Sequence, residues 1–182
     1  RGDIASAKAL LDSAGIKPDA NGVRIRAILD LIPYGEDWRR AGEYLKQVLG
    51  DIGIKLELRY EDVPTWLKRI YHNYDFVMNV NYFYQLPDPV LGVHRHYGTD
   101  QIRKGTHFVN SSRYSNSELD ELLASGATEA NAQKRTQIYK KIQEILARDM
   151  PVVNLFELQF LTVYNTKLKG AYNSALGAYA SF

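Results

Sequence analysis

The sequence predicts an α/β fold with an open, mostly parallel sheet flanked by helices. Three observations lead to this prediction. Segments 23–31 and 54–59 alternate apolar and polar residues as strands do, segment 74–80 is mostly apolar, and helical patterns separate all three. Strands joined through single helices run parallel, with right-handed crossovers. The order of elements is therefore that of one half of a doubly wound sheet.

The chain begins with a helix and a strand. Asp3 is placed to cap a helix that Gly15 ends, because a short polar side chain can accept from the first free backbone N–H groups. A polar turn over residues 17–22 leads into the first strand. In that strand Arg24, Arg26 and Asp30 occupy the polar positions of the alternation.

The second helix has the clearest amphipathic pattern. It opens at Asp37, Gly53 stops it, and one apolar stripe runs along it. The members of the stripe are Ala41, Tyr44, Leu45, Val48, Leu49 and Ile52. Beyond the second strand, Asp62 caps a short helix with Pro64 in its first turn, where a missing N–H costs little. The apolar third strand, 74–80, is predicted to be central.

The second half of the chain is predicted to be mainly helical. Weak periodicity over 81–113 leaves room for a short helix at 89–97. Ser115 and Glu118 resemble a capping box that opens a further helix. A longer helix over 131–150 carries one apolar face. That face consists of Ile138, Ile142, Ile145 and Leu146. Segments 152–156 and 161–164 are expected to be strands.

Composition excludes several classes of function. The chain has 182 residues, enough for one good-sized domain or a large piece of a longer protein. With 23 Lys and Arg against 21 Asp and Glu, the net charge of +2 does not suggest a nucleic-acid partner. There is no Cys, so disulfides, thiolate catalysis and Cys-based zinc sites are excluded. No apolar run approaches the roughly 20 residues of a membrane span.

The candidate binding residues lie where the first and third strands end. Ligands of open parallel sheets bind outside the carboxyl ends of the strands. The sequence brings an aromatic and amide-rich set to that edge, which suits an organic solute held by stacking and hydrogen bonds. The set consists of Tyr34, Asn81, Tyr82, Phe83, Tyr84, Gln85 and Asp88. The alternative interpretation is that Tyr82 and Phe83 pack beneath the long loop over residues 81–113.

The sequence contains few signs of catalysis or of cofactors. It has no nucleophile elbow, zinc-protease helix, phosphate loop or dinucleotide fingerprint, so neither an enzyme nor a cofactor is predicted. His94 and His96 fall in the short helix predicted at 89–97, where we interpret them as exposed histidines and a metal site is the alternative. The pairs Lys134-Arg135 and Lys140-Lys141 are interpreted as the solvated face of the long helix.

Several segments, in this order, resemble the family 5 extracellular solute-binding proteins of ABC transporters, the receptors for dipeptides, oligopeptides and nickel. The similarity spans nearly the whole chain. The similar segments are 3–15 with AKALLDSAG, 49–54, 74–76, 87–89, 110–120, 135–142, 149–151 and 168–170. Family members are longer and bilobal.

The resemblance implies a periplasmic-binding-protein-like lobe that is one part of such a protein. Residues 1–158 would be the second, C-terminal lobe without its start, and residues 159–182 a hinge-crossing strand and a tail that returns toward the first lobe. The sequence starts at Arg1 without a signal segment, so we expect a truncated or processed piece. We also expect a piece lacking half of a cleft to self-associate through exposed apolar surface.

The resemblance also implies a function. The whole protein would bind a small-molecule or peptide solute in the periplasm, or at the extracellular face of the membrane, and deliver it to the permease subunits of an ABC importer. Peptide receptors of the family carry a Trp and, three residues later, an Asp that pairs with the peptide amino group. The corresponding residues here are Tyr82 and Gln85, and a neutral amide cannot make that ion pair. Asp88 would fix the turn.

Other solutes and one other function class stay open at this point. A modified peptide, an opine-like compound, a sugar or a metal chelate would fit a neutral aromatic and amide site. The same module could instead serve as the effector-sensing domain of a transcription regulator. The sequence that precedes this chain would discriminate the two, because an importer component carries a signal peptide there and a regulator carries a DNA-binding segment.

Overall fold

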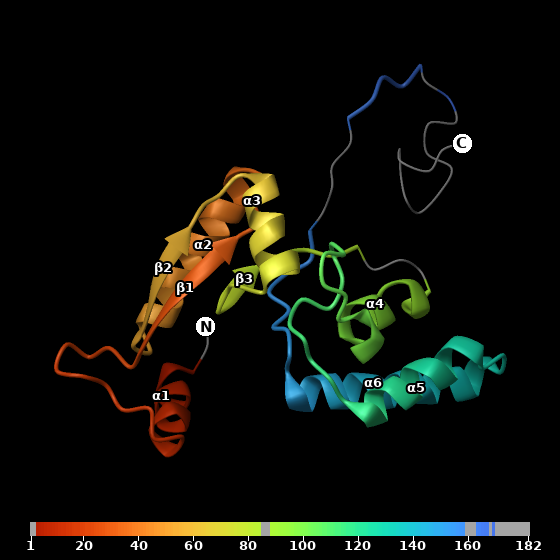
Figure 1. Ribbon diagram of the computed structural model, residues 1–182, viewed down its shortest axis with the longest axis horizontal. Helices are drawn as coiled ribbons and strands as arrows, with labels where there is room; N and C mark the ends of the chain where they lie inside the picture. The colour runs from red at the N-terminus through yellow and green to blue at the C-terminus, as the bar shows by residue number, and fades with distance from the viewer. Residues whose placement is uncertain (1–2, 85–87, 159–162, 168, 170–182) are drawn as a thin grey trace. The chain divides into compact units, whose positions relative to one another are not determined.

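The computed structural model describes residues 3–84, 88–158, 163–167 and 169 of the chain. The chain divides into two units, residues 1–151 and 152–182. The helices and strands of the first unit appear in Figure 1. In chain order they are α1 (Ile4–Ser13), β1 (Ile25–Leu31), α2 (Glu36–Gly50), β2 (Ile54–Arg59), α3 (Val63–Leu67), a π-helical turn (Lys68–Asn73), β3 (Met78–Val80), a 3-10 turn (Pro89–Leu91), α4 (Val93–Tyr97), a second 3-10 turn (Thr99–Gln101), α5 (Ser117–Thr128) and α6 (Ala132–Asp149).

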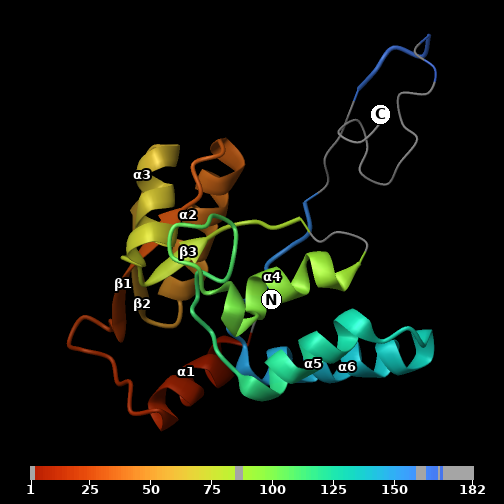
Figure 2. The same cartoon turned by 45° about the vertical axis from the view of Figure 1, so that its right-hand side comes forward.

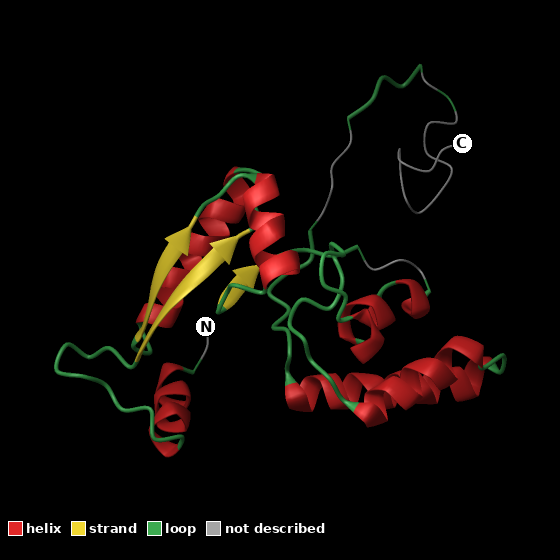
Figure 3. Cartoon of the chain, in the orientation of Figure 1, coloured by secondary structure: helices red, strands yellow, loops and turns green. Residues whose placement is uncertain are grey.

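The described strands form a parallel sheet in the order β2-β1-β3, which confirms the predicted fold class (Figure 3). The prediction that the third strand is central was wrong. β1 is central, and β3 is an edge strand of three residues, Met78–Val80. The strand begins late because Tyr74 ends the π-helical turn in the left-handed conformation, with φ of 52°. The connections β1-α2-β2 and β2-α3-β3 run in opposite directions across the sheet, and right-handed crossovers place α2 and α3 on opposite faces.

Helix caps follow the predicted chemistry at most ends. Asp3 and Asp62 accept backbone N–H groups at the starts of α1 and α3, and Asn131 does so for α6. At α5 the capping side chain is that of Asn116, which accepts from the backbone N–H of Leu119. The predicted capping box had placed the cap one residue earlier, at Ser115.

The first unit has two apolar cores. The sheet core lies between the strands and α2 and α3, and its large members include Trp38, Trp66 and Tyr71. The second core lies between α5 and α6, which run side by side in both views (Figures 1 and 2). It buries Ile142 and Ile145, as the periodicity of α6 predicted.

Two sequence-based expectations for helix and strand positions need correction. α2 buries Trp38 and Gly42, whereas Tyr44 of the predicted apolar stripe is 65% exposed. The buried face of α2 therefore runs through Trp38, Gly42, Leu45 and Leu49, and Tyr44 lies outside it. Residues 152–156 are not a strand. Apolar alternation favours a strand only where a neighbour supplies hydrogen bonds, and no strand in the described ranges pairs with this segment. The other predicted strand, 161–164, lies partly outside the described residues.

Candidate functional site

Four aromatic side chains lie together at the carboxyl ends of β1 and β3. We call Tyr34, Trp38, Tyr82 and Tyr84 the aromatic cluster. Tyr82 is at its centre: its ring stacks on Trp38 with centroids 5.3 Å apart, and it meets the rings of Tyr34 and Tyr84 edge-on at 5.9 and 5.6 Å. Trp38 is buried, whereas Tyr34 and Tyr84 are 41% and 51% exposed. The cluster thus presents tyrosine rings to solvent on a buried aromatic support.

Trp38 is the member of the cluster that sequence analysis missed. It lies in the first turn of α2, outside the apolar stripe assigned to that helix. The order of residues contains one signal that could have found it. Trp38 follows Tyr34 by four residues across a helix start at Gly35, and a chain that turns there brings both rings to one strand end.

Asn81 and Phe83 make contacts within the protein. The Asn81 amide nitrogen donates to the Tyr71 hydroxyl at 2.7 Å, and the Asn81 amide oxygen accepts from the Tyr82 backbone N–H at 2.8 Å. Burial raises the pKa of Tyr71 to about 12, so its hydroxyl stays neutral. The Phe83 ring lies 3.7 Å from the His96 ring, centroid to centroid. These contacts orient the segment that carries Tyr82 and Tyr84.

Asp88 is paired with a cation. Its carboxylate accepts from the Arg135 guanidinium at 2.7 Å and from the backbone N–H of Val90 at 2.9 Å. The hydrogen bond from Arg135 holds the pKa of Asp88 below its usual range. Arg135 also donates to the carbonyl of Gly126 at 2.9 Å, so the interpretation of this arginine as part of a solvated face was wrong. Gln85, the remaining predicted site residue, lies outside the described residues.

Asp88 and Arg135 line a groove between the end of α5 and the start of α6. The Asp88 carboxylate closes the 3-10 turn that begins at Pro89, which is the turn-fixing role expected of it. The structure therefore brings Tyr34, Tyr82 and Tyr84 together, and it ties Asp88 to the helical pair.

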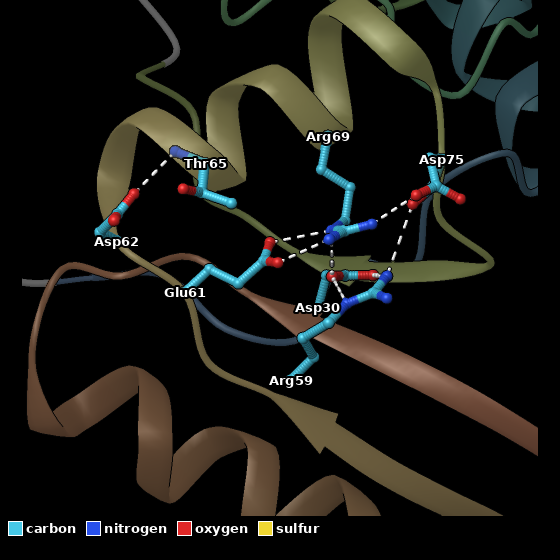
Figure 4. A network of polar contacts seen from close by, with 7 residues as sticks. All are labelled: Asp30, Arg59, Glu61, Asp62, Thr65, Arg69 and Asp75. Carbon is cyan, nitrogen blue, oxygen red and sulfur yellow. Dashed lines mark hydrogen bonds and ion pairs between the residues drawn. The ribbon is translucent and has the colours of Figure 1, made fainter.

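A second polar feature lies where β1 and β2 end, and sequence analysis missed it. We call Asp30, Arg59, Glu61, Arg69 and Asp75 the charge network (Figure 4). Asp30 is fully buried and accepts two hydrogen bonds from Arg59, at 2.6 and 2.8 Å. Arg69 makes a two-bond pair with Glu61, at 2.6 and 2.9 Å, and also contacts Asp75. The Arg69 guanidinium approaches Asp30 at 3.8 Å.

The charged groups of the network pair with one another. The hydrogen bond to Asp30 raises the pKa of Arg59, and the hydrogen bond from Arg69 lowers the pKa of Glu61. Three carboxylates share two guanidinium groups whose geometry matches carboxylates in pairs. The network ties the ends of two strands to the helix that follows them and thereby fixes the edge from which the aromatic cluster projects.

The histidine interpretation was half right. His94 is partly exposed and lies 2.9 Å from the Asp100 carboxylate. His96 is 4% exposed, contrary to the expectation for both. Burial, with a contribution from the neighbouring Arg95, lowers the pKa of His96 to about 4. No group of three or more potential ligands among His, Cys, Asp and Glu forms a metal site in the part of the chain that the structure describes.

Comparison with known proteins places the chain in a family. The family described as bacterial extracellular solute-binding proteins, family 5 Middle, matches residues 1–104. The chain belongs to the family 5 extracellular solute-binding proteins. The peptide transport periplasmic protein SapA of Haemophilus influenzae is 23% identical over 143 residues, covering 76% of this chain and 24% of SapA.

Solved structures of family 5 proteins agree with the fold. AppA of Clostridium difficile superposes with a TM-score of 0.68 at 28% identity, covering 82% of this chain and 29% of AppA. NikZ of Campylobacter jejuni, in complex with Ni(L-His), gives a TM-score of 0.73 at 16% identity, covering 83% and 31%. The periplasmic-binding-protein-like fold is therefore confirmed. This family 5 chain spans about a quarter to a third of the length of the curated relatives it matches. None of its described helices has the length and apolar character needed to cross a membrane.

Proposed function

We propose that this chain forms one wall of the solute cleft in a family 5 solute-binding protein. In this proposal the protein binds its solute between two lobes without catalysis, in the periplasm or outside the cell, and delivers it to the permease of an ABC importer. The predicted hinge-crossing strand and tail, residues 159–182, lie largely outside the described residues. The observation that carries the proposal is the aromatic cluster, which presents Tyr34 and Tyr84 at the strand ends where open parallel sheets bind ligands.

The chemistry of this wall favours a neutral or peptide-like organic solute. Tyrosine rings offer apolar faces together with hydroxyl groups that donate and accept hydrogen bonds. Asp88, the one carboxylate in the predicted set, is paired with Arg135, and the charge network is paired within itself. This wall therefore contributes stacking and hydrogen bonding, and it leaves pairing with a solute charge to other residues.

The test is solute binding to the full-length protein that contains this chain. A panel of dipeptides, tripeptides, sugars and metal chelates is screened by thermal shift, and the binding solute is then titrated by calorimetry. The fluorescence of Trp38 provides a second signal, because a solute that contacts the tyrosines changes the surroundings of the indole stacked on Tyr82. We expect Tyr84→Ala to weaken binding by about tenfold, the usual effect of truncating an aromatic anchor.

Tyr44→Ala is the matched control. Tyr44 is 65% exposed on α2 and lies outside the aromatic cluster, so its removal should leave affinity unchanged. Equal affinity of the wild-type protein and the Tyr84→Ala variant would contradict the proposed wall. So would the absence of any stabilising solute in the panel.

A further inference from the structure

Two histidines that are far apart in the sequence meet at the surface of the first unit. His72 is in the π-helical turn after α3, and His107 is in the segment that follows the second 3-10 turn. Their Nε2 atoms are 3.2 Å apart, the ring planes are inclined by 53°, and both side chains are exposed. Neither residue belongs to the predicted solute site.

The backbone around this pair is held in place. The backbone N–H of Gly105 donates to the carbonyl of Tyr71 at 2.8 Å, which ties the His107 segment to the turn that carries His72. Gly105 has φ of +87°, and a Cβ there would sit 3.4 Å from the His72 ring. The buried Tyr71 ring lies against His107, with centroids 5.8 Å apart. The two imidazoles are thus placed by a buried residue and a close backbone contact.

The separation of the two nitrogens matches a shared metal ion. Bonds of about 2.0–2.1 Å from zinc to imidazole nitrogen put two nitrogens at a tetrahedral angle about 3.3 Å apart. The observed separation of 3.2 Å is close to this value. The same spacing accommodates one N–H···N hydrogen bond between neutral rings, and a metal ion would replace that bond. Imidazole is a ligand that zinc, copper and nickel accept.

We propose that His72 and His107 form a two-histidine site for a divalent transition-metal ion, with water in the remaining positions. The ion would clip the π-helical turn to the segment around His107. The site does not depend on the proposed solute function, because it uses none of the aromatic cluster. Since the ion binds the folded chain, it should raise the thermal stability of the protein, and the gain should grow with the logarithm of the zinc concentration above the dissociation constant.

The probe is zinc chloride, titrated by calorimetry into the metal-free full-length protein at about pH 7.5, where imidazole is neutral. We expect one zinc ion per chain and a melting temperature that rises with zinc and returns on chelation. Loss of an outer partner of a metal ligand already costs 10–100-fold in affinity, so His72→Gln and His107→Gln should each weaken binding by at least about tenfold.

Two control variants isolate the site. His94→Gln removes a histidine outside the pair and should keep zinc affinity, and so should Tyr84→Ala, which separates this proposal from solute binding. Thermal melts without metal check that both glutamine variants fold, which is expected because both side chains are exposed. Unchanged zinc affinity in both glutamine variants would overturn the proposal, as would a wild-type protein that binds no zinc at about millimolar concentration.

Discussion

Replacing Arg59 with Met tests whether the charge network holds the strand ends together. The Asp30 side chain is 1% exposed and takes both of its short hydrogen bonds from Arg59. Without Arg59 the nearest cation is Arg69, at 3.8 Å. Removing one partner of a buried ion pair costs about 3–5 kcal/mol. Arg59 is 26% exposed and Arg69 remains, so the low end applies, a loss of about 3 kcal/mol of unfolding free energy.

Chemical denaturation of the full-length protein measures this loss, and the melting temperature should fall by about 6–12 °C if the domain melts independently. The control is a double-mutant cycle with Asp30→Asn, which removes the buried charge that Arg59 serves. In the Asp30→Asn background, Arg59→Met should cost much less than about 3 kcal/mol, because no uncompensated carboxylate remains. If Arg59→Met costs the same in both backgrounds, the pairing argument fails.

Two further substitutions test burial elsewhere in the first unit. The pKa of His96 is about 4 in the folded chain and about 6.5 in the unfolded chain, so lowering the pH protonates the unfolded state first. The free energy of unfolding should therefore fall by up to about 3 kcal/mol from about pH 6.5 to about pH 4. Chemical denaturation at several pH values measures this fall in unfolding free energy. The fall should be smaller in the His96→Gln variant, and an unchanged fall in that variant would show that His96 does not cause it. A Cβ on Gly42 would clash with the Leu31 side chain. Gly42→Ala should therefore destabilise the protein by about 1 kcal/mol, an overpacking cost of about 1–3 kcal/mol less a helix gain of about 1 kcal/mol. The control Gly50→Ala meets no atom within 4 Å and should be neutral or stabilising; equal effects of the two would contradict the packing argument.

Local patterns predicted most of the elements because those elements obey local rules. The caps at Asp3 and Asp62 and the alternation of β1 and β2 each depend on a few neighbouring residues. The place of β3 in the sheet does not. An apolar strand is as consistent with a half-covered edge as with a centre, and pairing along Leu29–Leu31 decides the matter. Strand order is a long-range property that apolar content alone does not reveal.

The candidate site shows the same division. The proximity of Tyr34, Tyr82 and Tyr84 could be predicted, because the carboxyl ends of the strands of a parallel sheet lie at one edge. Asp30 could not be placed from its own strand, where alternation assigns it to a polar face. The missing information was in the next strand, since Asp30 pairs in register with Arg59 and opposite charges at matching positions indicate a cross-strand ion pair.

The charge network and the aromatic cluster are linked through β1. Asp30 is the second-last residue of that strand, and Tyr34 follows it by four residues. A binding surface on loops is only as well positioned as the elements beneath it. At this edge the carboxylates and guanidinium groups of the charge network pair with one another. They therefore hold the strand ends together without attracting a charged solute. Tyrosine rings are left to meet the solute, which is why we expect affinity to respond to Tyr84 and stability to respond to Arg59.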